Sequence, residues 1–311
     1  MAEGALVFYS EVDIGPTWRD ALHHWMPDLD VRIWPDVGDP QEVRYVMVWK
    51  PPEGFFQAFP NLSLIVNLGA GVDAILARGD LPDVPITRVS DPHMSRMMAS
   101  YVVFAVLRYY RDIPEFERAQ RRSEWHYIHP REPDEFTVGV MGLGELGRRA
   151  AEELSRWGFR MRGWARSRHE IDGVETFAGP DELLDFLSAL DIAVVLLPST
   201  PDTRGMIDRT VLAGLPRGAK LINAARGDLI DEAALVAALD SGHIAEATLD
   251  AFQTEPLPAD HPFWGMEQVL ITPHLASIAL PRSSAKQIAE NIRRVDRGEA
   301  LMHQVDPKRG Y

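Results

Sequence analysis

The chain has 311 residues, of which 46% are hydrophobic and 25% charged, a balance typical of an ordinary globular protein of about two domains. Its 46 acidic and 32 basic side chains give a formal charge of −14, which argues against nucleic acid or an anionic membrane surface as the main partner. The absence of cysteine excludes disulfides, Cys-ligated zinc, iron–sulfur clusters and thiol nucleophiles. No metal site is predicted.

The first residues lack a secretory signal pattern, and the longest apolar run, 192–197, is far shorter than a membrane helix. We therefore expect a cytoplasmic protein.

Short β-rich runs alternate with longer helical segments, which predicts an α/β fold. In the first third of the chain, strands are predicted at 5–9, 31–33, 45–49 and 64–67. The segment 94–110 lacks Gly and Pro and is apolar on more than one face, so it predicts a buried helix that joins two domains. The polar stretch 111–135 contains three prolines and predicts a surface connection.

A second alternation begins after residue 136 and is more regular. Its first strand is followed by a Gly-rich turn and a helix to about residue 157. The uniformly apolar strand at 192–197 indicates a parallel sheet that is buried on both faces. The helix predicted at 282–297 can return to the first domain. The predicted strands are 137–141, 161–164, 192–197, 220–223, 247–250 and 269–272, and the further predicted helices are 181–190, 210–214 and 231–241.

The turn after strand 137–141 has the spacing G-x-G-x-x-G, with glycines at Gly142, Gly144 and Gly147. The first glycine permits a tight turn, the second lets the backbone approach a pyrophosphate, and the third allows close helix–strand packing. The N-terminus of the following helix favours phosphate groups. Because the turn stands between a strand and a helix, it predicts a dinucleotide site rather than a structural turn.

The end of the second strand indicates which dinucleotide is bound. NAD sites usually carry Asp or Glu there, to accept a hydrogen bond from the ribose 2′-hydroxyl. Here Ala165 takes that place and is followed by Arg166, Ser167 and Arg168. Guanidinium groups match a phosphate dianion, so we expect NADP(H) in preference to NADH. The alternative is a solvated basic loop.

Three later segments, 223–228, 249–256 and 272–277, stand at or just after predicted strand ends, where open α/β sheets bind ligands. They carry Arg226, Glu255 and His274. Each residue alone is more often an ion pair or a core residue, but together they suit reduction of a 2-oxo acid. A protonated His supplies a proton to the developing alkoxide, a carboxylate holds its second nitrogen, and Arg binds the substrate carboxylate.

On these segments, the glycine turn and 197–203, the chain resembles the D-2-hydroxyacid dehydrogenases over nearly its whole length. The resemblance implies that Arg226 binds substrate, His274 is the acid/base and Glu255 tunes it. It also implies two Rossmann-like domains with parallel sheets and an active site in the cleft between them. The substrate domain would be 1–100 with 280–311, the dinucleotide domain 101–279, and the protein a homodimer with the helix 94–110 near the contact. The cofactor residues implied are Gly142, Gly144, Glu145, Leu146, Gly147, Arg166, Ser167, Arg168, Leu197, Pro198, Thr203, Ala224, Ala225, Asp250, His274 and Ala276.

The first domain carries the predicted substrate residues. Leu68, Gly69 and Ala70 follow a strand, and successive N–H groups in such a turn can hold a carboxylate; the alternative is a plain strand-to-helix turn. Trp49, before a Pro-Pro loop, resembles the corresponding stretch of the glyoxylate/hydroxypyruvate reductase A type, and Trp264 is expected to close the other side of the pocket. Both tryptophans could instead be packing residues.

The resulting hypothesis is an NADPH-dependent reductase that converts glyoxylate to glycolate or hydroxypyruvate to D-glycerate. A second hypothesis is a broader D-2-hydroxyacid dehydrogenase that acts on bulkier acids such as phenylpyruvate. A third is a non-catalytic nucleotide-sensing protein, and a fourth is a methyltransferase with a glycine turn. The last two do not need the Arg, Glu and His set.

Overall fold

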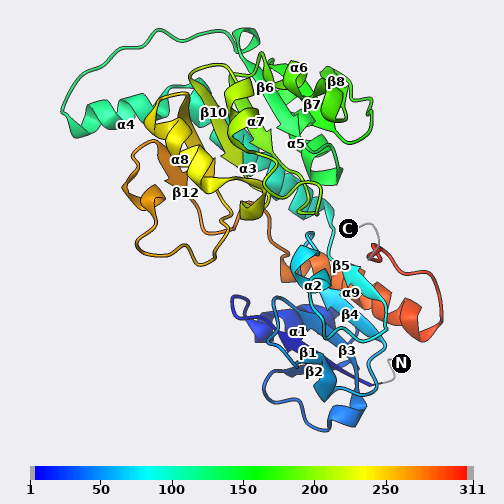
Figure 1. The fold of residues 1–311 in the computed structure, drawn as a ribbon. Coiled ribbons are helices and arrows are strands. Elements are labelled where there is room, and N and C mark those ends of the chain that lie inside the picture. The colour runs from blue at the N-terminus through cyan, green and yellow to red at the C-terminus, as the bar shows by residue number, and fades with distance from the viewer. Residues whose placement is uncertain (1–3, 307–311) are drawn as a thin grey trace. The chain divides into compact units, whose positions relative to one another are not determined.

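The computed structural model describes residues 4–306, which form two compact units (Figure 1). Within the described residues, one unit comprises 4–94 and 278–306, and the other comprises Ser95–Ser277. The predicted boundaries, at 100/101 and 279/280, lie a few residues further along the chain than the boundaries between these two units, at 94/95 and 277/278. The difference arises in helix α3 (Pro92–Tyr110), because Met94 packs in the core of the first unit and Met98 already packs in the core of the second.

The first unit is built on a five-stranded parallel sheet of order β2-β1-β3-β4-β5. Successive residues of β1 point to opposite faces, so Leu6 and Phe8 join one core while Val7 joins the other. The first core is completed by α1 and α9, which pack against each other. The elements are β1 (Ala5–Tyr9), α1 (Gly15–Trp25), β2 (Asp30–Ile33), β3 (Val43–Val48), β4 (Leu64–Asn67), α2 (Asp73–Leu76), β5 (Ile86–Arg88) and α9 (Pro281–Asp296).

The second unit is built on a seven-stranded parallel sheet of order β12-β11-β10-β9-β6-β7-β8. Its strands are β6 (Thr137–Met141), β7 (Arg160–Ala165), β8 (Val174–Ala178), β9 (Ile192–Val195), β10 (Ala219–Asn223), β11 (Ile244–Leu249) and β12 (Val269–Ile271). Its helices after α3 are α4 (Ile113–Arg121), α5 (Glu145–Ser155), α6 (Leu183–Leu187), α7 (Arg209–Gly214) and α8 (Glu232–Asp240).

Both faces of this second sheet are covered. Side chains of α3 and α5 form one core with the sheet, and side chains of α6, α7 and α8 form another on the opposite face. Strand β9 is buried along its whole length, as the apolar run predicts for a central parallel strand. The predicted α/β class and parallel sheets are thus confirmed.

The structure also differs from the predicted elements. The connection predicted at 111–135 contains helix α4. Pro114 does not prevent this helix, because it lies in the first turn, where the missing N–H would have no partner within the helix. Helix α1 and strands β5 and β8 were not predicted; β5 and β8 are edge strands, β5 is only three residues long, and β8 has no buried residue. Within residues 4–306, no helix combines the length and apolar character needed to cross a bilayer.

Candidate active site

Three neighbouring strands of the second unit end at the same edge of the sheet. Asn223 of β10 pairs with Leu249 of β11, which in turn pairs with Ile271 of β12. The segments that follow these strands carry Arg226, Glu255 and His274. The parallel register therefore explains how three segments far apart in the sequence meet at the carboxyl edge, where open α/β sheets bind ligands.

The turn after β10 holds Arg226. The buried Asn223 side chain donates to the Arg226 carbonyl oxygen at 2.9 Å and accepts from the Ala225 N–H at 3.1 Å. A Cβ atom on Gly227 would lie 1.8 Å from the carbonyl carbon of Phe252. Only glycine fits this close approach, which brings the Arg226 turn against the loop that leads to Glu255.

His274 lies between the other two residues. Its Nδ1 is 2.9 and 3.0 Å from the two carboxylate oxygens of Glu255, and its Nε2 is 3.5 Å from Nη1 of Arg226. A carboxylate partner on Nδ1 fixes the tautomer that carries hydrogen there. When the ring is protonated, Nε2 carries the second hydrogen. Nε2 and the guanidinium lie close enough to act on one oxygen atom of a ligand, Nε2 by giving this proton and Arg226 by donating a hydrogen bond.

The glycine turn has the features that a dinucleotide requires. Gly142 has φ +101, and a Cβ atom there would lie 2.6 Å from the Leu196 carbonyl oxygen. A Cβ atom on Gly147 would lie 1.8 Å from the Gly142 carbonyl oxygen. On Gly144 it would meet no atom within 4 Å among the described residues, so there is room for a ligand. Gly144 is also the N-cap of α5, whose first-turn N–H groups the helix itself cannot pair. The turn therefore fits a pyrophosphate.

The basic residues after β7 lie on the surface, and Arg166, Ser167 and Arg168 are all exposed. Arg168 is engaged within the chain: it pairs with Glu182 and donates to the Thr176 carbonyl oxygen. The N–H of Ala178 and the Arg168 guanidinium hold the pKa of Glu182 below its usual range, so Glu182 is a charged competitor for any phosphate at Arg168. Glu182 was not predicted from the sequence, because it lies 14 residues after Arg168 in the chain.

The remaining predicted cofactor residues lie at the carboxyl ends of β9, β10 and β11 and in the loop after β12. The Thr203 hydroxyl donates to the Pro198 carbonyl oxygen at 2.6 Å. The Asp250 carboxylate is buried and accepts hydrogen bonds from the loop after His274. Both side chains have partners within the protein. The residues concerned are Leu197, Pro198, Thr203, Ala224, Ala225, Asp250 and Ala276.

The predicted substrate residues of the first unit meet at the carboxyl ends of β3 and β4. The Trp49 ring packs so tightly on Gly69 that a Cβ atom there would lie 2.5 Å from it. The Asn67 side chain donates to the carbonyl oxygens of Gly69 and Gly71 at 3.0 and 2.9 Å, which fixes the loop of Leu68 and Ala70. Sequence reasoning did not assign this role to Asn67.

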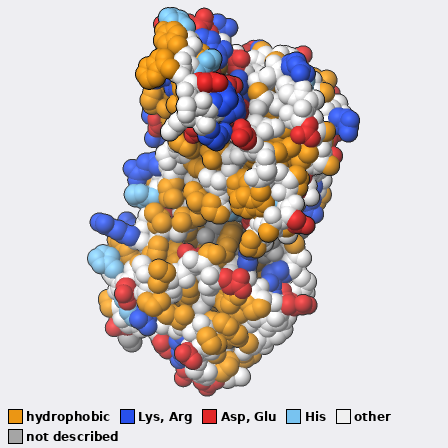
Figure 2. Space-filling view, turned by 90° about the vertical axis from the view of Figure 1, so that its left-hand side faces the viewer, with side chains coloured by type: hydrophobic (Ala, Val, Ile, Leu, Met, Phe, Trp, Pro, Cys, Tyr) orange, Lys and Arg blue, Asp and Glu red, His pale blue; other side chains and the backbone are white. Residues whose placement is uncertain are grey.

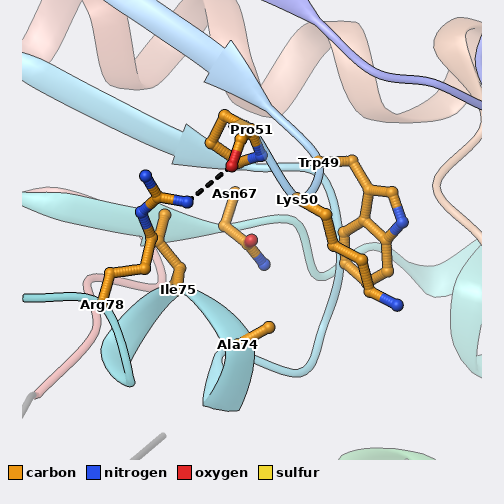
Figure 3. Close-up of a pocket in the computed structure, with 7 residues that line it drawn as sticks. All are labelled: Trp49, Lys50, Pro51, Asn67, Ala74, Ile75 and Arg78. Carbon is orange, nitrogen blue, oxygen red and sulfur yellow. Dashed lines mark hydrogen bonds between the residues drawn. The ribbon is translucent and has the colours of Figure 1, made fainter. Parts of the chain in front are cut away.

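A cavity of about 130 Å³ lies beside this loop. Figure 3 shows Trp49 and Lys50 on one side of it and Arg78 on the other, where Arg78 donates to the Pro51 carbonyl oxygen at 2.5 Å. The lining residues are Trp49, Lys50, Pro51, Asn67, Ala74, Ile75 and Arg78. Trp264 belongs to the other unit, where it is 55% exposed and donates to the Pro258 carbonyl oxygen at 2.9 Å.

Comparisons with known proteins identify the family of the chain. A family model for the NAD-binding domain of D-isomer specific 2-hydroxyacid dehydrogenases matches residues 103–276. The glyoxylate/hydroxypyruvate reductase A of Serratia proteamaculans is 40% identical over 312 residues, which cover 98% of this chain and 99% of that protein. A D-isomer specific 2-hydroxyacid dehydrogenase from Xanthobacter autotrophicus Py2, solved with NADPH and MES, is 62% identical with a TM-score of 0.95 over the whole of both chains. The NADPH-dependent glyoxylate/hydroxypyruvate reductase of Sinorhizobium meliloti, solved with NADP and sulfate, is 35% identical with a TM-score of 0.93 and covers 99% of this chain and 100% of that one. The chain thus belongs to the D-isomer specific 2-hydroxyacid dehydrogenase family.

Proposed function

We propose that the protein is an NADPH-dependent reductase of small 2-oxo acids, which converts glyoxylate to glycolate and hydroxypyruvate to D-glycerate. One observation carries the proposal: His274 lies between the Glu255 carboxylate, at 2.9 Å, and the Arg226 guanidinium, at 3.5 Å. A nucleotide-sensing protein or a methyltransferase has no need of this proton donor. Relatives named as reductases of these two acids support the choice of substrate.

In this reaction His274 is the general acid. When bound, the reduced nicotinamide supplies the hydride that adds to the carbonyl carbon. His274 gives the proton on Nε2 to the carbonyl oxygen, which becomes the hydroxyl group of the product. Glu255 holds Nδ1 and stabilises the charged ring before transfer, and Arg226 binds the substrate carboxylate and polarises the carbonyl group.

NADPH is the proposed cofactor, with its 2′-phosphate at Arg166, Ser167 and Arg168 and its pyrophosphate at the turn of Gly144. Charge-assisted hydrogen bonds to a phosphate dianion are stronger than the pairing of Arg168 with an exposed carboxylate. The phosphate would therefore replace Glu182 at Arg168. The solved relatives that contain NADPH and NADP support the same cofactor.

The substrate residues proposed are Arg226 in the second unit and Trp49, Leu68, Gly69 and Ala70 in the first, with Trp264 as a further pocket residue. The small cavity beside Trp49 and the packing of its ring on Gly69 support a small 2-oxo acid. A broader enzyme that takes phenylpyruvate is the alternative. The expected cleft between the domains and the cytoplasmic location stay predictions.

The Trp49→Ala variant tests the choice between these two substrate classes. If Trp49 limits the pocket, the variant gains activity on phenylpyruvate and loses activity on glyoxylate. An unchanged ratio of the two kcat/KM values would mean that Trp49 is only a packing residue.

We also propose that the protein is a homodimer. Large hydrophobic side chains are exposed on α3 and on the segment after α4: Phe104 is 53% exposed, Tyr127 73% and Trp125 100%. In Figure 2 this segment projects at the top of the molecule, with hydrophobic side chains on its surface. Light scattering of the eluted protein should give twice the chain mass, and Trp125→Ser should shift it towards the monomer. A wild-type protein that stays monomeric at micromolar concentration would contradict the proposal.

The direct test of function follows NADPH and NADH oxidation with glyoxylate, hydroxypyruvate, pyruvate and phenylpyruvate. We expect the highest kcat/KM with NADPH and the first two acids. His274→Ala should lose about 10²- to 10⁴-fold in rate, the contribution of general acid catalysis. If the wild-type protein oxidises neither cofactor with any 2-oxo acid, the proposal is wrong.

A further inference from the structure

The loop that carries His274 is anchored on Asp250. The Asp250 carbonyl oxygen accepts the N–H of His274 at 2.8 Å, and its carboxylate accepts the next two N–H groups, of Leu275 at 3.0 Å and Ala276 at 2.9 Å. His274 has φ +54, a conformation that non-glycine residues keep only when surrounding contacts impose it. The position of the imidazole therefore depends on Asp250.

Asp250 is in turn tied to helix α3. The Thr272 hydroxyl donates to Asp250 Oδ1 at 2.6 Å, and the Tyr101 hydroxyl lies 2.6 Å from Thr272 Oγ1. Because a carboxylate only accepts, Thr272 uses its hydrogen on Asp250, and Tyr101 must be the donor to Thr272. Burial raises the pKa of Tyr101 to about 12, so its hydroxyl keeps this hydrogen throughout the neutral range.

We propose that Tyr101 is a positioning residue for proton transfer. Its hydroxyl orients Thr272, which fixes Asp250, which holds the loop and the imidazole of His274. Hydrogen bonds arranged in such a chain strengthen one another. The inference rests on the proposed function, because it takes His274 to be the general acid.

Helix α3 itself supplies a matched control. Tyr109 lies on the same helix, is buried, and has its hydroxyl 2.6 Å from Thr248 Oγ1. Thr248 lies inside strand β11, whereas Thr272 immediately follows β12 and precedes His274 by two residues. Tyr109→Phe therefore removes the same kind of hydrogen bond from the same helix, but not from the chain that leads to His274.

The first experiment measures the single-turnover oxidation of bound NADPH by glyoxylate in Tyr101→Phe and Tyr109→Phe. Displacing a catalytic group by a fraction of an ångström slows the chemical step without weakening substrate binding. We expect the single turnover of Tyr101→Phe to be about 3- to 10-fold slower than that of the wild type, while the glyoxylate concentration that gives half of the maximal rate stays within about twofold. Tyr109→Phe should change neither quantity by more than about twofold. Equal rates in the two variants would overturn the inference.

Thr272 provides the second arm. Thr272→Val removes the hydroxyl at nearly constant shape and should slow the single turnover by more than Tyr101→Phe does, whereas Thr272→Ser keeps the hydroxyl and should restore the rate. Because Tyr101 acts through Thr272, the double variant Tyr101→Phe/Thr272→Val should be no slower than Thr272→Val alone. Additive losses would show that Tyr101 acts by another route.

A measurement without cofactor separates this inference from the proposed function. Hydrogen exchange of the peptide that spans 272–278 reports how firmly the loop is held. Tyr101→Phe should speed its exchange by about 10-fold, and Tyr109→Phe should leave it unchanged. Unchanged exchange in Tyr101→Phe would refute the positioning role even in an active enzyme. A wild-type protein without reductase activity would refute only the catalytic role of His274.

Discussion

Two glycines of the turn, Gly144 and Gly147, should respond differently to substitution by alanine. On Gly144 the new Cβ atom meets no neighbour within 4 Å in the described part of the chain, and the φ of −67 is one that alanine adopts without strain. The unfavourable alanine at a helix N-cap and the reduced entropy of the unfolded chain oppose each other. The net change in the free energy of unfolding should be below about 0.5 kcal/mol.

Gly144→Ala should weaken the binding of NADPH strongly, because the added methyl group occupies the space in which a pyrophosphate approaches the first turn of α5. Losing one charge-assisted hydrogen bond, at about 1.5–3 kcal/mol, corresponds to a Kd for NADPH raised about 10- to 100-fold. Fluorescence titration measures the Kd, and thermal unfolding followed by circular dichroism measures stability. Gly79→Ala, at another position with no described neighbour within 4 Å, is the control that should change neither.

Gly147→Ala should behave in the opposite way. Its Cβ atom would lie 1.8 Å from a backbone oxygen, so α5 must shift by about 1 Å, at a cost of about 1–3 kcal/mol in stability. If folded Gly144→Ala bound NADPH as tightly as the wild-type protein, the assignment of the turn to the pyrophosphate would be refuted.

Three further substitutions test other parts of the structure. Glu182→Gln removes the carboxylate that pairs with Arg168, so the affinity for NADPH should rise about two- to fivefold while that for NADH stays constant; weaker NADPH binding would contradict the proposed competition. Gly227→Ala, whose Cβ would meet a backbone carbon at 1.8 Å, should separate Arg226 from the Glu255 loop and slow glyoxylate reduction more than it weakens NADPH binding; normal kinetics would disprove this close contact. Burial raises the pKa of Glu246, and Arg118 partly offsets the shift. A raised native pKa means that the stability of the fold falls as pH rises through that pKa. Arg118→Met leaves the Glu246 carboxylate without its partner, so the variant should lose about 3 kcal/mol of unfolding free energy at pH 8 and less at pH 5, as measured by denaturant titration. An equal loss at both pH values would show that Glu246 does not titrate in this range.

The elements that the sequence predicts best are those with a strong local residue pattern. A uniformly apolar run such as that of β9 is typical of a buried strand, and the spacing of Gly142, Gly144 and Gly147 between a predicted strand and a predicted helix is typical of a tight turn that binds a dinucleotide. The strand-end segments with Arg226 and His274 belong to the same class, because parallel strands bring their carboxyl ends to one edge. These features account for most of the second unit.

The features that the sequence misses depend on contacts between distant segments. The bond between Tyr101 and Thr272 spans 171 residues, and neither side chain has a local pattern that would indicate its partner. Helix α4 was hidden because Pro114 and many charged residues are typical of a loop, although proline is well tolerated in a first turn. The division of α3 between two cores likewise depends on packing, and nothing in its local sequence marks the residue at which the change occurs.

The central claim is that His274 and Arg226 act together on the carbonyl group of a 2-oxo acid. A crystal structure of the complex with NADP and oxamate, an unreactive analogue, tests it most directly. The account predicts the oxamate carbonyl oxygen within about 3.2 Å of His274 Nε2 and its carboxylate within hydrogen-bond distance of Arg226. Oxamate bound away from both side chains, beside an ordered nicotinamide, would contradict the account.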